Sequence, residues 1–187
     1  LLRCLRAHGW TRDLKNRQAT EARYPQIDPE YLFINTGFNL RPTEINAAFG
    51  LIQLRKLDGF NRRRREMAAL LNQRLLPLIE RGVFCPMQPA AQAHTVWFGY
   101  PVICREPRVR QALKDHLRSH NIETRPIICG NMARQPALEH IRHRIAGELS
   151  GADKIMDCGL LWGLSPLMSN DDLEYIIRTV LEFAIEP

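Results

Sequence analysis

The residues with the clearest capacity for chemistry lie just before a predicted long helix. In the segment FNLRPTE, residues 38–44, Asn39 and Arg41 precede Pro42, which suits the first helical position, and Glu44 follows in the first turn. The free N–H groups and the macrodipole of a helix N-terminus attract anions. An amide and a guanidinium add donors at the same place, so the spacing predicts an anion site. A helix cap followed by a surface arginine would give the same pattern.

A second polar group follows a predicted strand in IETRPIICGNMARQP, residues 122–136. Arg125 comes at the strand end, before a proline, where a side chain can point into a cleft. Gly130 and Asn131 predict a tight turn, and Arg134 follows it. Two arginines and an asparagine around one turn suit a phosphate or a sugar. A polar surface loop is the alternative.

The histidines and cysteines give no comparable signal. His140 and His143 are three residues apart, but no further metal ligand is near them in sequence, so we expect no metal site. The five cysteines are scattered without a CxxC pair, and none has a local signature of a nucleophile. We interpret them as free thiols, which predicts a reducing, cytoplasmic location.

The charge of the chain is basic, with a formal net charge of +6. Arginine dominates, with 22 residues against four lysines, and the planar guanidinium suits bidentate recognition of phosphate or carboxylate. The run RRRR at residues 62–65 raises nucleic-acid binding as an alternative. Four consecutive helical residues point in four directions, however, and no aromatic residues are interleaved with them. No run of about 18 apolar residues occurs, so we expect no membrane span.

The elements that must position these residues form a predicted α/β lobe behind a long helix. A helix end at residues 1–8 stops at Gly9, an irregular excursion covers 10–29, and a short extended piece covers 31–34. The long helix is predicted over 42–76, with a weak point at Asp58 and Gly59. Beyond it we predict strands at 94–104, 122–129 and 159–165, and helices at 107–121, near Pro136, at 152–158 and at 169–184.

These segments together resemble the DegT/DnrJ/EryC1/StrS family of pyridoxal-phosphate (PLP) nucleotide-sugar enzymes. The block GFNLRPTEINAAFGLIQL is similar to the family pattern G-[YF]-N-x-R-x-[TS]-E-x-x-A-A-x-G-x-x-Q-L. LLRCLRAHGWTRDL looks like the segment after the cofactor lysine, and HTVWFGYPV looks like the first strand of the small domain. DCGLLWGLSPLMSNDDLEYIIRTVLEF is similar to the family's C-terminal end. The resemblance covers nearly the whole chain, in family order.

The resemblance implies that the chain is the C-terminal part of a fold-type-I PLP enzyme. Residues 1–41 would end the large cofactor domain, 42–76 would form the connecting helix, and 77–187 the small domain with a short, mainly antiparallel sheet and flanking helices. The chain opens in mid-helix without a methionine, which we interpret as a piece of a longer protein. None of the four lysines matches the motif of the cofactor lysine, so we expect no catalytic residue in this chain.

The resemblance also implies roles for the polar residues. Asn39 would reach the PLP phosphate of the partner subunit in a homodimer with shared active sites, and Arg41 would meet the substrate there. Arg125, Asn131 and Arg134 would bind a nucleotide-diphosphate sugar. PLP is expected in the intact parent enzyme, not on this chain alone.

The loop ETRPIICGNMARQPAL resembles the 4-keto-6-deoxy-sugar 3-dehydratase subset more than the plain aminotransferases, so both activities stay open. Two alternatives remain beside them. The chain could be a non-catalytic remnant that dimerises or binds a nucleotide sugar, or a basic nucleic-acid-binding domain.

Overall fold

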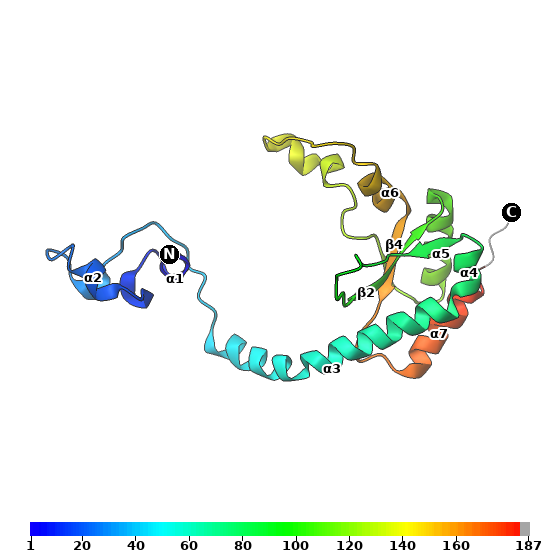
Figure 1. Cartoon of the computed structure of the whole chain (residues 1–187), viewed down its shortest axis with the longest axis horizontal. Coiled ribbons are helices and arrows are strands. Elements are labelled where there is room, and N and C mark those ends of the chain that lie inside the picture. The colour runs from blue at the N-terminus through cyan, green and yellow to red at the C-terminus, as the bar shows by residue number, and fades with distance from the viewer. Residues whose placement is uncertain (184–187) are drawn as a thin grey trace. The chain divides into compact units, whose positions relative to one another are not determined.

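The computed structural model describes residues 1–183 and contains two compact units, residues 1–56 and the residues from Leu57 onward. The boundary between them falls inside the longest helix, α3 (Figure 1). The helices are α1 (Leu2–Leu5), α2 (Arg17–Glu21), α3 (Glu44–Arg74), α4 (Leu76–Glu80), α5 (Pro107–Ser119), α6 (Ser150–Cys158) and α7 (Asn170–Leu181), with short 3-10 helices η1 (Thr11–Asp13), η2 (Pro29–Tyr31), η3 (Met132–Arg134) and η4 (Pro136–His140). The strands are β1 (Phe84–Pro86), β2 (Gly99–Cys104), β3 (Thr124–Arg125) and β4 (Gly159–Gly163).

The first unit is held together by backbone contacts between residues 5–11 and residues 32–40. The N–H of His8 donates to the carbonyl of Phe38, and the N–H of Ile34 donates to the carbonyl of Gly9, both at 3.0 Å. A Cβ on Gly37 would lie 2.4 Å from the backbone nitrogen of Gly9, so this approach requires glycine. Gly9 has a φ of +87°, but the first helix already ends at Leu5 with Arg6 as its C-cap, so the helix stop predicted at Gly9 was wrong.

The predictions for the first unit were otherwise approximate. The first helix is limited to Leu2–Leu5, and the excursion over residues 10–29 contains the helix α2. The extended piece predicted at 31–34 forms only a single bridge, between Trp10 and Phe33.

The long helix α3 begins and ends slightly inside the predicted range. Pro42 is not its first residue: Thr43 accepts a 3.4 Å hydrogen bond from the N–H of Asn46 at its hydroxyl, so the helix begins at Glu44. The weak point predicted at Asp58 and Gly59 was wrong, because α3 continues through both residues to Arg74. The interruption comes instead before Pro77 in α4, since proline cannot continue the hydrogen-bond ladder of α3.

The second unit contains a four-stranded antiparallel sheet in the order β1-β2-β4-β3. The predicted short antiparallel sheet with flanking helices is therefore confirmed, although β1 was not predicted and all three predicted strands are shorter than expected. The strand predicted over 122–129 ends at Arg125, because Pro126 has no N–H to donate and Ile128 has a φ of +51°. The helix predicted near Pro136 is a 3-10 helix, and the last helix ends at Leu181. Ala184, its predicted end, lies outside the described residues.

The core of the second unit lies on one face of the sheet. Alternate residues of β2 and β4 point into it, among them Val102, Leu160 and Trp162, each with a fully buried side chain. The second half of α3 and the helices α4, α5 and α7 complete this core. The other face of the sheet is bordered by α6 (Figure 1).

The arginine run at residues 62–65 helps to fix the segment before α7. The guanidinium of Arg63 donates to the carbonyl of Met168 at 3.2 Å and to the side chain of Asn170 at 2.7 Å. Arg64 donates to the carbonyl of Leu164 at 3.2 Å. Two of the four arginines therefore serve packing within the unit. Within residues 1–183, no helix is both long enough and apolar enough to cross a membrane.

The cap of α7 gives a direct test of this packing. Ser169 accepts from the N–H of Asp172 at 3.0 Å. Asp172 accepts from the hydroxyl of Ser169 at 2.6 Å and from its N–H at 2.9 Å, and these two bonds, the hydroxyl bond first, lower the pKa of Asp172. Ser169→Ala is expected to reduce the free energy of unfolding by about 1 kcal/mol in urea titration, because the N–H of Asp172 loses its acceptor. Ser150→Ala, at the uncapped start of α6, is the matched control. Equal urea midpoints for the two variants would contradict the expectation.

Candidate functional site

The first predicted site lies at the end of the strand-like segment that precedes α3. Asn39 forms an antiparallel bridge with Ala7, and the N–H of Leu40 donates to the carbonyl of Arg6 at 2.9 Å. These backbone contacts fix the main chain of Asn39 while its side chain remains exposed. The amide is therefore available to an external acceptor, five residues before Glu44, the first residue of α3.

Arg41 belongs to a small charged cluster that the sequence did not predict. The guanidinium groups of Arg41 and Arg6 both lie 3.5 Å from one carboxylate oxygen of Asp13. Two positive charges share one negative charge, so the group keeps a net charge of +1 beside the start of α3. Arg6 and Asp13 had no local motif, and only the return of the chain at residues 38–40 brings Arg41 to them.

The first half of α3 carries an exposed apolar face. Ile45, Phe49 and Ile52 follow helical spacing and remain 69%, 68% and 45% exposed. Leu51 and Leu54, on other sides of the same helix half, are 62% and 65% exposed as well. An exposed apolar surface of this kind is typical of a protein contact rather than of a solvated helix.

Arg125, the first residue of the second predicted site, ends the edge strand β3. Its side chain is 69% exposed and pairs with Glu123 at 2.9 Å. An ion pair this exposed contributes little, roughly 0–1 kcal/mol. The guanidinium of Arg125 can therefore leave Glu123 for a stronger anion.

Asn131 and Arg134 lie close together because both bind carboxylates of α6. Asn131 is only 4% exposed, and its amide donates to Asp153 at 2.8 Å while its amide oxygen accepts from the N–H of Ala133 at 2.9 Å. Arg134 lies 3.2 Å from Asp153 and 3.1 Å from Asp157. We name these four side chains, Asn131, Arg134, Asp153 and Asp157, the Asp153 cluster.

The Asp153 cluster fixes the loop after β3 to the surface of α6. The hydrogen bond from Asn131, followed by the bond and charge of Arg134, lowers the pKa of Asp153. The two carboxylates raise the pKa of Arg134 in turn. Gly130 has a φ of +63°, and a Cβ there would lie 2.4 Å from the Cα of Met156, so the loop backbone is in direct contact with the helix.

The structure thus separates the three predicted loop residues into two groups. Among residues 1–183, no hydrogen bond or ion pair joins Arg125 to the Asp153 cluster. Asp153 and Asp157 were missed by sequence reasoning. Their spacing of four residues on the helix predicted at 152–158 was the available signal, because it puts both carboxylates on one face.

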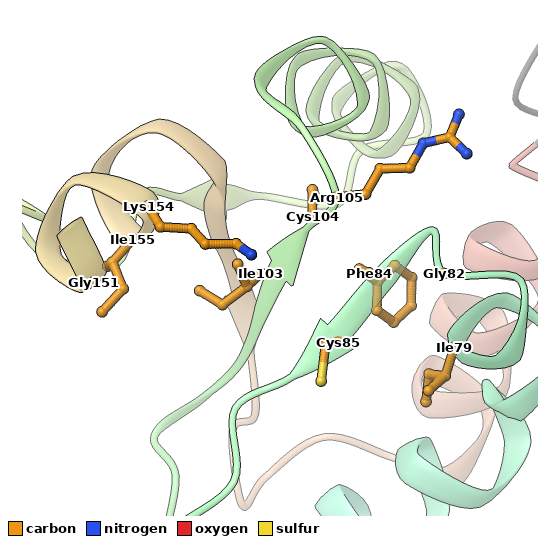
Figure 2. Close-up of a pocket in the computed structure, with 10 residues that line it drawn as sticks. All are labelled: Ile79, Gly82, Phe84, Cys85, Ile103, Cys104, Arg105, Gly151, Lys154 and Ile155. Carbon is orange, nitrogen blue, oxygen red and sulfur yellow. The ribbon is translucent and has the colours of Figure 1, made fainter.

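The remaining reactive groups form no second centre in the described part of the chain. No three potential metal ligands gather there. Burial, followed by the charge of Cys158, raises the pKa of Cys104 to about 12, so this thiol stays protonated near neutral pH. A hollow of about 470 Å³ lies between α6 and the β1–β2 edge, with Cys85, Ile103 and Lys154 among its lining residues (Figure 2). None of the predicted site residues lines it.

The Asp153 cluster predicts a localised change in dynamics. Asp153→Asn should increase hydrogen exchange at the N–H groups of Ala133 and Arg134, because Arg134 loses one of its two carboxylates. Asp115→Asn, on the exposed side of α5, is the matched control. Since the pKa of Asp153 is lowered on folding, its stabilising contribution is present above its usual pKa, about 4, and is lost as the pH falls through that region. Protection that is unchanged in Asp153→Asn would contradict the role of the cluster.

Comparison with known proteins gives a continuous match. The model of the DegT/DnrJ/EryC1/StrS aminotransferase family matches residues 1–181. The GDP-4-keto-6-deoxy-D-mannose 3-dehydratase of Yersinia pseudotuberculosis is 33% identical over 168 residues, covering 87% of this chain and 42% of the relative. The dTDP-4-dehydro-2,6-dideoxy-D-glucose 3-dehydratase of Saccharopolyspora spinosa is 32% identical over 163 residues, covering 85% of this chain and 34% of the relative. The chain therefore spans less than half the length of these relatives.

Solved structures agree with the sequence relatives. The E. coli GDP-4-keto-6-deoxy-D-mannose-3-dehydratase with bound hydrated PLP matches with a TM-score of 0.76 and 27% identity, over 96% of this chain and 46% of that chain. A variant of GDP-4-keto-6-deoxymannose-3-dehydratase with bound GDP-perosamine matches with a TM-score of 0.78 and 27% identity, over 95% of this chain and 46% of that chain. The predicted fold, the C-terminal part of a fold-type-I PLP enzyme, is confirmed. The chain belongs to the DegT/DnrJ/EryC1/StrS aminotransferase family.

Proposed function

We propose that this chain is the C-terminal part of a PLP-dependent enzyme that modifies a nucleotide-diphosphate sugar in deoxysugar biosynthesis. The carrying observation is the fold match to GDP-4-keto-6-deoxymannose 3-dehydratases along at least 95% of the chain. Two relatives above 30% identity are 3-dehydratases, which favours removal of a sugar hydroxyl over amino transfer. Sugar amino transfer by the same scaffold is the second candidate, because the family model is that of aminotransferases.

The predicted division into parts belongs to this proposal. Residues 1–41 would end the large domain, 42–76 would connect, and 77–187 would form the small domain. We propose that the parent enzyme acts in the cytoplasm, which is consistent with five free cysteines in the chain.

The donors before α3 fit a phosphate group. Asn39 has an exposed amide, and Arg6 and Arg41 share only one carboxylate. Bound PLP would supply an electron sink for chemistry at the sugar. Asn39 would donate its amide N–H to the phosphate of the cofactor on the partner subunit, and Arg41 would attract the anionic substrate to the same site. Lys15, Lys56 and Lys154 are exposed side chains without the family motif, so no proton transfer is assigned to them.

A homodimer with shared sites accounts for the apolar face of α3. Ile45, Phe49 and Ile52 would be covered in the parent enzyme, which brings the neighbouring Asn39 to a subunit boundary. A non-catalytic remnant that dimerises or binds a nucleotide sugar would also bury the apolar face of α3. The sequence upstream of residue 1 distinguishes them, since only an enzyme needs a cofactor domain there.

In the loop after β3, we assign substrate binding to Arg125 and positioning of the loop to Asn131 and Arg134. Arg125 is exposed and weakly paired, so it would bind the substrate diphosphate directly. Asn131 and Arg134 were predicted to bind substrate as well, and that contact stays a prediction. Their bonds to Asp153 and Asp157 support an indirect contribution in which they hold the loop in the geometry that Arg125 requires.

Kinetics of the full-length parent test the assignment of Arg125. Arg125→Lys keeps the charge but loses the planar fork, so KM for the nucleotide sugar should rise about 10- to 150-fold with little change in melting temperature. Arg134→Lys should instead alter loop protection together with kcat, because Lys cannot bridge two carboxylates in the same way. Arg108→Lys, an exposed arginine on α5, is the control. A KM for Arg125→Lys equal to that of the wild type would mean that this loop does not contact the substrate.

Subunit mixing tests Asn39. In the parent enzyme, Asn39→Ala should weaken PLP retention, whereas Asn35→Ala, an exposed neighbour in the first unit, should not. A heterodimer of one Asn39→Ala subunit and one subunit that lacks its own cofactor residue should regain one working site. Failure to regain activity in every mixture would mean that Asn39 acts within its own subunit.

A further inference from the structure

A cleft in the first unit combines aromatic and charged side chains that the proposed function leaves without a role. It encloses about 170 Å³ and is lined by Trp10, Arg12, Arg17, Glu30 and Tyr31. We name it the Trp10 cleft. All of its residues belong to residues 1–56, so it is complete within one compact unit.

Trp10 organises this cleft through three contacts. Its indole N–H donates to the carbonyl of Glu30 at 2.7 Å. Its ring stacks on Tyr31 and Phe33, with ring centroids 6.0 and 5.8 Å apart and interplanar angles of 20°. The indole therefore fixes two aromatic rings that remain 65% and 50% exposed. Flat rings that are held in place and open to solvent are suited to stacking against a planar ligand.

The charged groups of the cleft are arranged around these rings. The guanidinium of Arg12 lies 5.1 Å from the centre of the Trp10 ring, in cation–π geometry. Arg17 is bound to Glu21. Glu30 uses its backbone atoms in the fold, and within residues 1–183 its carboxylate has no hydrogen-bond or ion-pair partner. Glu30 lines the cleft and directly precedes Tyr31 in the chain, so a carboxylate without a partner belongs to the residue next to an exposed aromatic ring.

We propose that the Trp10 cleft binds the nucleobase of the nucleotide sugar and that Glu30 selects guanine. The base would stack on the exposed face of Tyr31, and the Glu30 carboxylate would accept hydrogen bonds from its Watson–Crick edge. Guanine carries two adjacent donors there, the N1–H and the N2 amino group, which match the two oxygens of a carboxylate. This inference rests on the proposed function, because it assumes that the substrate carries a nucleotide.

Thymine and adenine fit the carboxylate poorly. Thymine presents a single N–H between two carbonyl oxygens, which repel the negative charge. Adenine presents a ring acceptor, N1, beside its amino group. A carboxylate at this position therefore discriminates by repulsion as well as by attraction. The question is open among the relatives, since one acts on a GDP sugar and another on a dTDP sugar.

Calorimetry of the purified 187-residue chain tests the proposal, with GDP, dTDP and inorganic pyrophosphate as probes. We expect GDP to bind about tenfold more tightly than dTDP, and pyrophosphate to bind more weakly than either. Glu30→Gln should weaken GDP binding about tenfold and leave dTDP binding nearly unchanged. Tyr31→Ala should weaken both nucleotides about tenfold, whereas Tyr31→Phe, which keeps the ring, should not. Glu80→Gln, an exposed residue of the second unit, is the control for Glu30.

The outcomes separate this site from the proposed function. Absent GDP binding, equal affinity for GDP and dTDP, or an unchanged preference in Glu30→Gln would each overturn base selection by the cleft. Self-association that is lost in Tyr31→Ala, without nucleotide binding, would reassign the rings to a protein contact and overturn it too. If the parent enzyme dehydrates nucleotide sugars equally well with Glu30→Gln, the proposed function stands and base selection by Glu30 is overturned. GDP-selective binding by the chain, with a parent protein that does not modify nucleotide sugars, would keep base selection by the cleft and overturn the proposed function.

Discussion

The pairing of β2 with β4 is the contact on which the second unit depends. It joins segments about 60 residues apart, with Tyr100 opposite Trp162 and Val102 opposite Leu160. Its register directs Val102, Leu160 and Trp162 into the core, and a shift of one residue would turn them to the opposite face. Because α6 ends at Cys158 and β4 begins at Gly159, the same register fixes where α6 lies. β3 pairs with the other edge of β4, so the loop that follows it meets Asp153 and Asp157 on α6.

In the first unit, close backbone contacts rather than a sheet fix the position of the site residue Asn39. The backbone around Gly9 and the backbone around Gly37 approach so closely that neither position can carry a side chain without displacing the backbone. That contact, together with the bridge between Ala7 and Asn39, sets where Asn39 emerges ahead of α3. The glycine of the G-[YF]-N pattern therefore has a packing role, and the asparagine two residues later depends on it.

Local chemistry decided which parts of this architecture could be predicted from sequence. Asn39 and Arg41 could be proposed from sequence because a helix start and its neighbours lie within a few residues, although Thr43 rather than Pro42 determines where α3 begins. The segment 122–129 has strong strand propensity, but Pro126 and the left-handed Ile128 end the strand at Arg125. Arg6, Asp13, Asp153 and Asp157 were missed because their partners are distant in sequence, and only the fold brings them together.

Arginine shows how burial and pairing divide one residue type among different tasks. Arg63 and Arg64 donate to backbone carbonyls and serve packing, while Arg134 is held between two carboxylates. Arg125 has one exposed partner, and Arg41 shares its partner with Arg6. A guanidinium that is already saturated gives up strong bonds to bind a ligand, whereas a weakly paired one gives up little. By this criterion Arg41 and Arg125 give up less on binding an anion than Arg63, Arg64 or Arg134 do, and the bonds of Arg134 hold the loop after β3 on α6.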